Sequence, residues 1–249
     1  MKRFEGKAAF VTGAAAGIGR ATAVRLAREG ASVYIVDVAD EGLEETAKLC
    51  EEEGAAVAFS RCDVTREEDV KGAVQDCVDR FGRLDTVCNI AGILLLDHFQ
   101  EISVDQFRKV LEVNLVGVFA LCQAALPHLI ESKGSIVNTS STSALSGMPY
   151  GAAYGTSKGG VSALTRTLAV EFGKQGVRCN AVCPGSIKTA MMGGNTLPEN
   201  ADMALVMRAS SLSKPKGPES VAAVIAMLAS EDGIHINGEE VRVDGGTLA

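Results

Sequence analysis

Residues 8–19 read AAFVTGAAAGIG, an apolar run that turns at glycines and leads directly into a helical pattern. Glycines at positions 13, 17 and 19 let the backbone turn sharply, and the first amides of the helix attract an anion. The G-x-x-x-G-x-G spacing differs from the G-x-G-x-x-G fingerprint, although the flanking strand and helix are what that fingerprint requires. We therefore expect Gly13, Gly17, Ile18 and Gly19 to hold a diphosphate; a glycine turn without a ligand is the alternative.

Apolar runs with strand character alternate with helical periods along the rest of the chain. The expected strands are Lys7–Thr12, Ser32–Asp37, Ala56–Arg61, Leu84–Ile90, Ser135–Thr139, Val177–Cys183 and Glu240–Val243. The expected helices are Gly17–Arg28, Glu41–Glu52, Glu67–Phe81, Val104–Leu126, Ala153–Gly173 and Pro218–Leu228, and glycines that favour left-handed caps follow four helical stretches, at Gly30, Gly54, Gly82 and Gly176. This alternation predicts an α/β fold of the Rossmann type, a doubly wound, seven-stranded parallel sheet with helices on both faces.

The domain organisation is simple. No linker, repeat or low-complexity segment interrupts residues 1–249, so we expect a single dinucleotide-binding domain. The exception is Lys188–Gly217, a long segment with little strand character that carries four methionines, Met191, Met192, Met203 and Met207. A loop of this length inside a compact domain is usually a functional lid or a disordered segment, and we expect a substrate loop.

Composition excludes several classes of function. The net charge is −7 with no basic cluster, which disfavours nucleic acid and anionic membranes as partners. We find neither a secretory leader nor an apolar stretch of the ~20 residues that a bilayer requires. The seven cysteines lack C-x-x-C spacing and the three histidines are isolated, so we expect no disulfide framework, no metal site and a cytoplasmic location.

Asp37 suggests which dinucleotide the loop binds. It ends the second apolar strand, 18 residues after Gly19, where a carboxylate can bind the adenosine ribose hydroxyls. A carboxylate there also repels the 2′-phosphate of NADP, and neither the glycine loop nor Val38 offers a cation for it. We therefore expect NAD(H) to be preferred over NADP(H); a helix cap or turn role ahead of Asp40 is the alternative.

Tyr154 and Lys158 lie four residues apart in an expected helix, so their side chains leave the same face. A free phenol has a pKa of about 10 and is a poor base at neutral pH, but a nearby ammonium lowers that pKa. The pair could therefore act as an acid/base couple. An ordinary pair on an exposed helix face is the alternative.

Together these motifs resemble the short-chain dehydrogenase/reductase superfamily, in its branch of roughly 250-residue single-domain enzymes, over nearly the whole chain. The similar segments are Thr12–Gly19 (T-G-x-x-x-G-x-G), Asn89-Ile90-Ala91-Gly92 (N-N-A-G, with Ile as the second residue), Tyr154–Lys158 (Y-x-x-x-K) and Pro184–Thr189 (the P-G loop). The departure at Ile90 puts only local backbone support in doubt.

The resemblance implies four catalytic residues. Tyr154 would donate the proton in reduction and accept it in oxidation, while Lys158 would lower the pKa of Tyr154 and hold the nicotinamide ribose. Ser141 has the family spacing for the serine that binds the substrate oxygen, with Ser140 and Ser143 as rivals. Asn114 matches the asparagine that anchors a water relay to the lysine, although a lone polar residue in a helix is the alternative. With Tyr154 in place of a Lewis acid, no metal is needed.

The same resemblance implies cofactor contacts beyond the glycine loop. Asp63 and Val64 match the adenine-edge contact, although Asp63 could instead cap the following helix. The other matching positions are Asn89, Ala91 and Gly92 after the fourth strand, and Pro184, Gly185, Ile187 and Thr189 beside the nicotinamide.

The implied function is hydride transfer between nicotinamide and a secondary alcohol or ketone. Reduction of 3-oxoacyl thioesters on acyl carrier protein is one alternative, and a non-catalytic NAD-binding sensor or scaffold is another. The expected pocket walls are Leu94-Leu95-Leu96, Met148, Tyr150 and the Met191–Met207 segment, which suit a small, mostly apolar substrate, although ordinary packing is the alternative. Arg208, Lys214 and Lys216 are the possible charged handles. Family members usually form tetramers through the helices around Asn114 and Tyr154 and the C-terminal segment, so we expect a homotetramer.

Overall fold

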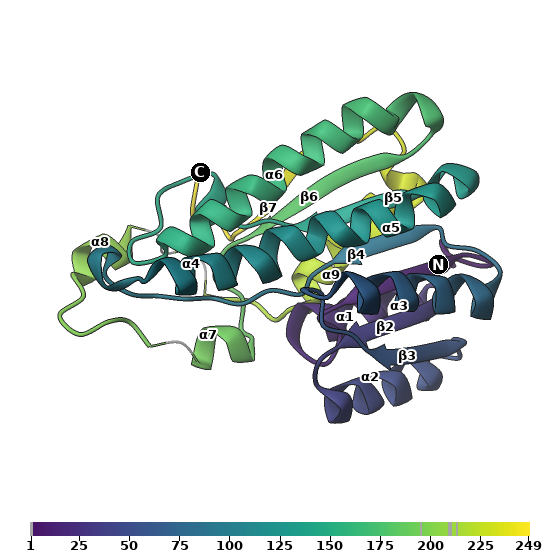
Figure 1. Ribbon diagram of the computed structural model, residues 1–249, viewed down its shortest axis with the longest axis horizontal. Helices are drawn as coiled ribbons and strands as arrows, with labels where there is room; N and C mark the ends of the chain where they lie inside the picture. The colour runs from purple at the N-terminus through teal and green to yellow at the C-terminus, as the bar shows by residue number, and fades with distance from the viewer. Residues whose placement is uncertain (1, 195, 209–210, 213) are drawn as a thin grey trace.

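A seven-stranded, all-parallel sheet forms the centre of the computed structural model, which describes residues 2–194, 196–208, 211–212 and 214–249 (Figure 1). The strands are β1 (Ala8–Thr12), β2 (Ser32–Asp37), β3 (Val57–Arg61), β4 (Thr86–Asn89), β5 (Ser135–Thr139), β6 (Arg178–Pro184) and β7 (Glu240–Val243). Their order is β3-β2-β1-β4-β5-β6-β7, so the chain reverses its winding direction between β1 and β4. The predicted doubly wound sheet is confirmed.

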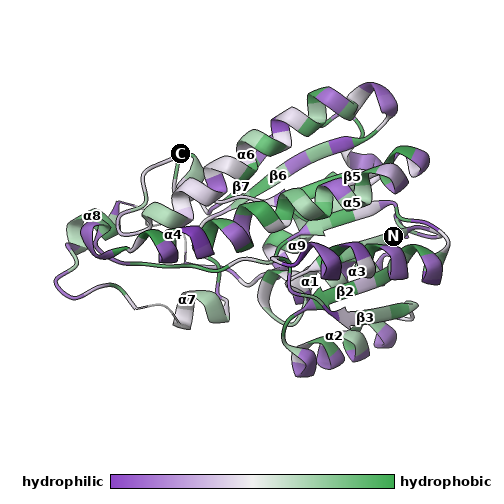
Figure 2. Ribbon diagram, viewed as in Figure 1, coloured by the Kyte–Doolittle hydropathy of each residue, from purple (hydrophilic) through white to green (hydrophobic). Residues whose placement is uncertain are grey.

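Helices cover both faces of the sheet. The main ones are α1 (Gly17–Arg28), α2 (Asp40–Glu52), α3 (Glu67–Phe81), α4 (Val104–Leu111), α5 (Gly117–Ser132), α6 (Ala152–Phe172) and α9 (Glu219–Ala229). Helices α1, α2 and α9 share one hydrophobic core with the sheet, and α3, α5 and α6 share the other. Figure 2 shows the matching pattern, with hydrophobic residues along the strands and α5 and hydrophilic residues on the outer sides of α2 and α3.

One predicted helix differs in extent and in form. The stretch expected to end at Leu126 continues through Pro127 to Ser132, and a π-helical turn at Glu112–Val116 joins α4 to α5. Proline removes one helical hydrogen bond, but the added turns bury Leu129 completely and end at Lys133 in the left-handed conformation. The other predicted boundaries agree to within two residues.

The same helix corrects an expectation about membranes. Val104–Ser132 forms one 29-residue helical stretch that is apolar enough, by length and composition alone, to cross a bilayer. In the fold it packs on α3, α6 and β4, and it buries Leu121 and Leu129 in the core. Its apolar character therefore contributes to core packing on one side, while Val116 and Phe119 remain exposed on the other.

The segment 188–217 contains two short helices that the sequence did not predict. Helices α7 (Ala190–Gly194) and α8 (Met203–Met207) have five residues each, too few to show a helical period. Ile187 pairs with Lys216, so the segment leaves and rejoins the fold at one point. We name residues 188–217 the arm; Asn195, Ala209, Ser210, Ser213 and the side chain of Met192 fall outside the described part.

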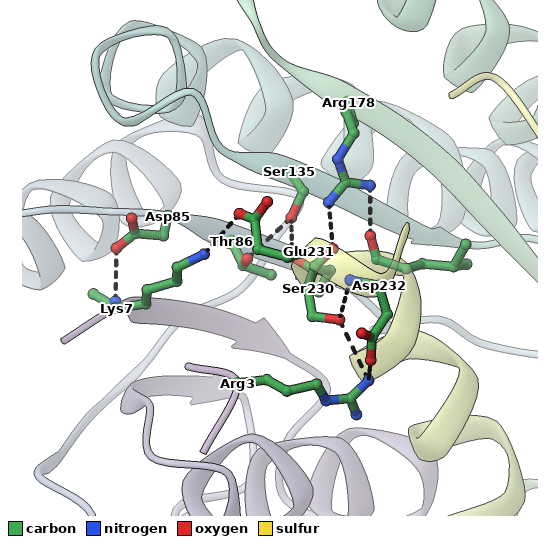
Figure 3. Close-up of polar contacts among 12 residues, drawn as sticks. Arg3, Lys7, Asp85, Thr86, Ser135, Arg178, Ser230, Glu231 and Asp232 are labelled. Atoms are coloured by element: carbon green, nitrogen blue, oxygen red, sulfur yellow. Dashed lines mark hydrogen bonds and ion pairs between the residues drawn. The ribbon is translucent and has the colours of Figure 1, made fainter. Parts of the chain in front are cut away.

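Ion pairs and hydrogen bonds tie the amino ends of the strands together (Figure 3). Arg3 bonds Glu29 Oε1 at 2.8 Å and Asp232 Oδ2 at 2.6 Å, joining the N-terminal segment to α1 and to the turn after α9. Arg178, at the start of β6, donates to the carbonyls of Leu228 (2.6 Å) and Ser230 (3.1 Å). The amino edge of the sheet is therefore closed by polar contacts, while the opposite, carboxyl edge borders the arm.

We expect Arg3→Ala to lower the free energy of unfolding by about 1–3 kcal/mol, because Glu29 is only 5% exposed and loses one of its two cationic partners. Urea denaturation followed by far-ultraviolet circular dichroism measures this. Arg28→Ala, which removes an exposed pair with Glu53, is the matched control and should cost less than about 1 kcal/mol. Equal losses in the two variants would contradict a structural role for the buried contact.

Candidate active site

A cavity of about 870 Å³ lies at the carboxyl ends of the strands, where the winding of the sheet reverses. Most of the predicted site residues line it: Gly13, Gly17, Ile18, Gly19, Asp37, Asp63, Val64, Ala91, Gly92, Ser141, Tyr154, Lys158, Pro184, Gly185, Ile187 and Thr189. Ligands of open α/β sheets bind in this position, and the volume lies within the range of small-molecule pockets. The structure thus brings together residues that are up to 176 positions apart in sequence.

The glycine turn closes tightly on the neighbouring strand. Thr12 Oγ1 accepts hydrogen bonds from the amides of Ile90 (2.9 Å) and Ala91 (3.0 Å), which draws the ends of β1 and β4 together. Gly13 has a φ of +66°, and a Cβ there would lie 2.8 Å from the Ala91 nitrogen. A Cβ on Gly19 would lie 2.0 Å from the Gly13 oxygen. Any side chain at either position would therefore force the turn apart.

The start of α1 suits an anion. Its N-cap residue, Ala16, provides no side-chain cap, and the first turn holds no acidic residue. The first amides and the positive end of the helix dipole therefore face the cavity without a competing side chain. This arrangement fits the diphosphate of a dinucleotide, so the residues present match the cofactor that the sequence implies.

Asp37 accepts hydrogen bonds from the backbone of two segments at the cavity, the glycine turn and the residues that follow β2. Its Oδ2 accepts from the Ala15 amide at 3.1 Å, and its Oδ1 accepts from Val38 at 2.7 Å. The N-cap of α2 is Ala39, so Asp37 is a turn residue that also lines the cavity. Among the described lining residues, Lys158 is the one cation. Arg20, which sequence reasoning passed over, is paired with Glu45 at 2.7 Å.

Asp63 does not cap the helix that follows it. Arg66 occupies the N-cap of α3 without a side-chain bond, whereas Asp63 accepts from the amide (3.0 Å) and the hydroxyl (2.7 Å) of Thr65. These bonds, the backbone one foremost, lower the pKa of Asp63. Asp63 is therefore an ionised turn residue at the cavity wall, next to Val64.

Tyr154, Ser141 and Lys158 meet at the centre of the cavity. Helix α6 presents Tyr154 and Lys158 one turn apart, and Ser141 directly follows the residue after β5. The Lys158 ammonium lies 5.7 Å from the centre of the Tyr154 ring and donates to the Thr139 carbonyl at 2.7 Å. Lys158 is 3% exposed, which excludes the alternative of a surface pair.

Burial controls the protonation of this group. It raises the pKa of Tyr154, which a hydrogen bond with Ser141 lowers and the nearby Cys183 raises further. It also lowers the pKa of Lys158 to about 8, against a smaller opposing effect of Cys183. The sequence predicted that Lys158 would lower the pKa of Tyr154. In the structure the Lys158 Nζ is directed at the Thr139 carbonyl, and burial raises the pKa of Tyr154. The expected lowering of the Tyr154 pKa by Lys158 stays a prediction.

Asn114 lies in the π-helical turn, fully buried behind the cavity. Its side chain accepts from the Ile93 amide at 2.8 Å and donates to the Ile93 carbonyl at 2.9 Å and to Ser157 Oγ at 3.1 Å. A Cβ on Gly92 would lie 3.1 Å from Asn114 Oδ1 and 3.5 Å from Lys158 Nζ. Asn114 and the lysine therefore border the same small space, and π-helical turns are frequent at functional sites.

Of the three candidate serines, Ser141 alone bonds the phenol of Tyr154. The Ser140 hydroxyl instead donates to the Lys158 carbonyl at 3.0 Å and lies 2.9 Å from Ser162 Oγ, which in turn donates to Glu240 at 2.6 Å. Ser140 therefore fixes the backbone around the site. Sequence reasoning missed this support from Ser162 and Glu240 because it depends on contacts between distant segments.

Asn89 is the predicted cofactor contact that points elsewhere. Its amide donates to Asn138 Oδ1 at 2.8 Å between β4 and β5, and the residue does not line the cavity. By contrast, Gly185 bonds the Val243 carbonyl at 3.2 Å, which places the P-G loop at the cavity. The Thr189 methyl would lie 3.4 Å from a Cβ on Gly17. The loop and the start of α1 thus lie close together at the cavity wall.

The far end of the cavity is mainly apolar. Its described apolar walls include Leu94, Leu96, Met148, Met191, Leu197 and Val206. Leu95, Tyr150, Met203 and Met207, expected as walls, do not line it, and neither do the possible charged handles Arg208, Lys214 and Lys216. Leu197 and Val206, which belong to the Met191–Met207 segment expected as a wall, line the cavity because the arm folds back over it.

Comparisons with known proteins agree with this geometry. A family model described as enoyl-(acyl carrier protein) reductase matches residues 13–247. The chain is 39% identical to meso-2,3-butanediol dehydrogenase of Serratia marcescens, over 99% of this chain and 96% of that protein. It is 38% identical to 3-oxoacyl-[acyl-carrier-protein] reductase of Thermotoga maritima, over 99% of both. Carveol dehydrogenase from Mycobacterium avium, crystallised with NAD, superposes with a TM-score of 0.90 at 30% identity, over 100% of this chain and 99% of that one.

We expect Lys158→Met to raise the free energy of unfolding at pH 7 by about 1–3 kcal/mol, because the buried ammonium costs solvation that its bond to Thr139 only partly replaces. The pKa of Lys158 is about 8 in the folded protein, and its ordinary value is 10.5. Between pH 8 and pH 10.5 the unfolded chain therefore holds a proton on Lys158 that the folded protein has lost. The stability advantage of the variant should therefore be full below pH 8 and shrink as the pH rises toward 10.

Urea titrations at pH 7 and pH 10 measure the effect, with Lys174→Met, which removes an exposed lysine, as the control. A destabilised Lys158→Met protein at pH 7, or an advantage independent of pH, would show that the ammonium is not held at a solvation cost.

Proposed function

Because the chain belongs to the short-chain dehydrogenase/reductase superfamily, we propose that Tyr154, Ser141, Lys158 and Asn114 carry the reaction of that family in this cavity. The chain is an oxidoreductase that transfers a hydride between nicotinamide and a secondary alcohol or ketone, and it uses NAD(H). The observation that carries the assignment is the Tyr154 phenol, bonded to Ser141 and one helical turn from a buried lysine.

NAD(H) supplies or accepts the hydride, and the side chains position the substrate and move one proton. In reduction, the Ser141 hydroxyl and the Tyr154 phenol hold the carbonyl oxygen, and Tyr154 gives that oxygen its proton as the carbon gains the hydride. In oxidation, the phenolate takes the alcohol proton as the carbon loses the hydride. Burial raises the pKa of the Tyr154 phenol and so favours its protonated form, the form that reduction requires.

Lys158 and Asn114 would assist proton transfer, and Lys158 would also bind the ribose of the cofactor. The Lys158 ammonium is fixed by the Thr139 carbonyl, and the remaining donor capacity of Nζ suits the nicotinamide ribose hydroxyls. Asn114 borders the same space at Gly92 and would hold a water that returns a proton to Lys158. Both assignments rest on position beside the phenol and on the family pattern.

The NAD(H) preference over NADP(H) would come from Asp37. Its carboxylate, fixed by the amides of Ala15 and Val38, occupies the end of β2 where the adenosine ribose would lie. A 2′-phosphate there would meet the negative charge, and Arg20 is engaged by Glu45.

The substrate would be a small, mostly apolar alcohol or ketone, because the described walls beyond Ser141 combine Leu, Met and Val side chains with the uncharged Thr142, Ser143 and Ser146. The similarity to a 3-oxoacyl-[acyl-carrier-protein] reductase keeps thioester reduction as a second candidate, although no described cationic side chain lines the far end to hold a phosphate. A non-catalytic NAD-binding sensor or scaffold is disfavoured by the intact pair of Tyr154 and Lys158.

Exposed apolar side chains on the long helix support assembly. Val104, Val116 and Phe119 are 63%, 44% and 51% exposed. We propose that a second copy of the chain covers this face in a homotetramer. The seven cysteines are buried free thiols, which fits a reducing, cytoplasmic location.

The function is tested by a panel of secondary alcohols, ketones and acyl thioesters, followed at 340 nm with NAD(H) and with NADP(H). Turnover of neutral alcohols or ketones with NAD(H) is the expected result. Turnover restricted to acyl thioesters with NADPH would transfer the assignment to the second candidate.

We expect Tyr154→Phe to reduce kcat at least about 100-fold, because the general acid is lost while the ring remains. NADH binding, followed by fluorescence, should stay within about twofold of the wild-type value. Retention of more than a tenth of the wild-type kcat would refute Tyr154 as the acid/base residue.

We expect Asp37→Ala to lower the ratio of kcat/KM for NAD to kcat/KM for NADP by at least about tenfold. A tenfold change corresponds to about 1.4 kcal/mol, a modest value for the repulsion between a carboxylate and a phosphate. Steady-state kinetics with both cofactors measure the ratio. Asp40→Ala, which removes a charge three residues away, is the control and should leave the ratio near its wild-type value. An equal ratio in wild type and Asp37→Ala would exclude Asp37 as the selecting residue.

A further inference from the structure

Three segments far apart in sequence meet at the outer edge of the cavity, on the arm between α7 and α8. The Tyr150 hydroxyl accepts a hydrogen bond from the Asp202 amide at 2.7 Å. The His98 ring lies edge-on to the Tyr150 ring, 5.2 Å between centres, and its Nε2 bonds the Glu199 carbonyl at 2.8 Å. Two aromatic side chains from the body of the protein therefore hold the arm at two points of its backbone.

The backbone at this junction is strained. Tyr150 has a φ of +64° and Asn200 a φ of +58°, and Lys133 is the one other non-glycine residue in the described part of the chain with a positive φ. Lys133 is explained by the end of α5, but Tyr150 ends no helix. The left-handed conformation is unfavourable for a bulky residue and persists where the surroundings hold it in place.

The body side of the junction is itself fixed. The Asp97 amide donates to the Tyr150 carbonyl at 2.9 Å, and Asp97 Oδ1 accepts from the His98 amide at 2.8 Å. Hydrogen bonds with Asp97 therefore fix Tyr150 and His98 relative to each other, and both side chains contact the arm. Asp202 continues the connection into the arm, where its side chain caps α8 at the Ala204 amide (2.8 Å).

The part of the arm that Tyr150 and His98 hold contains two residues of the cavity wall, although Tyr150 and His98 themselves do not line the cavity. Glu199 and Asp202 lie between Leu197 and Val206, which line the cavity, whereas neither Tyr150 nor His98 does. Leu197 is 37% exposed and Val206 is half-buried, so core packing holds these two walls only weakly. The two hydrogen bonds to the arm backbone, one on each side of Asn200, therefore help to hold these walls over the cavity.

We propose that Tyr150 and His98 are specificity-determining residues, which fasten the arm so that Leu197 and Val206 limit the size of the substrate. They act through the arm and contact neither the reacting carbon nor the cofactor. The substrate readout rests on the proposed function, and the position of the arm is tested independently of turnover.

Tyr150→Phe is the direct test, because it removes one hydroxyl and keeps the ring against His98. The equilibrium between fastened and released arm should shift by about threefold to fivefold, the effect of one hydrogen bond. KM for a small ketone should rise by at most that factor, because it scales with the inverse of the fastened fraction, with kcat within about twofold and NADH binding unchanged. The ratio of kcat/KM for a bulky ketone over a small one should rise by a similar factor, because the released walls admit the larger substrate.

Limited proteolysis gives a readout that needs no substrate. Arg208 is exposed and directly follows α8, so trypsin cleavage there should accelerate about threefold to fivefold when the arm is released. His98→Phe, which keeps an aromatic ring but loses the bond to Glu199, should change kinetics and cleavage in the same direction.

Tyr34→Phe is the matched control, because it removes a hydroxyl bonded to Ser60 in the body of the sheet, away from the arm. It should leave two quantities at their wild-type values: the size ratio, which is kcat/KM for the bulky ketone divided by kcat/KM for the small one, and the rate of cleavage at Arg208. Unchanged cleavage at Arg208 in Tyr150→Phe would overturn the fastening, whatever the kinetics. Faster cleavage with an unchanged size ratio would overturn the role in specificity, and a wild-type protein inactive on all ketones would refute the proposed function instead.

Discussion

Thr12 and Gly13 hold the carboxyl ends of β1 and β4 together, and the site is built around that contact. The Thr12 hydroxyl binds two successive amides of the neighbouring strand, and Gly13 approaches that strand more closely than any side chain would allow. The contact lies where the winding of the sheet reverses, so the start of α1 opens onto a cavity instead of a packed strand. The anion-binding end of the helix and the end of β4 thus face the same space.

The side chains proposed to be catalytic lie where burial disfavours their charged forms. Lys158 is almost fully buried, and its pKa falls to about 8, while burial raises the pKa of Tyr154. Burial therefore favours the neutral form of each group, the protonated phenol of Tyr154 and the uncharged amine of Lys158. The polar support from Ser140, Ser162 and Glu240 holds the surrounding backbone against the strain of burying these groups.

The fold and the centre of the site could be predicted because their signals are local. Strand and helix periods, glycines at turns and the spacing of Tyr154 and Lys158 all act within a few residues, and the predicted elements agree with the structure. The π-helical turn at Asn114, the hydrogen bond of Asn89 to Asn138 and the helices of the arm were not predictable. They depend on which distant segments pack together, and five-residue helices have no measurable period. Tyr150 was expected in the cavity wall but lies outside it, where its ring meets His98 and its hydroxyl accepts from the Asp202 amide.

A crystal structure of the protein with bound NAD⁺ tests the account most directly. The account predicts diphosphate oxygens at hydrogen-bond distance, about 3 Å, from amides of the Gly13–Gly19 turn, and a nicotinamide ring facing the Tyr154 hydroxyl. A diphosphate bound away from that turn, or a Tyr154 hydroxyl directed away from the nicotinamide, would contradict it.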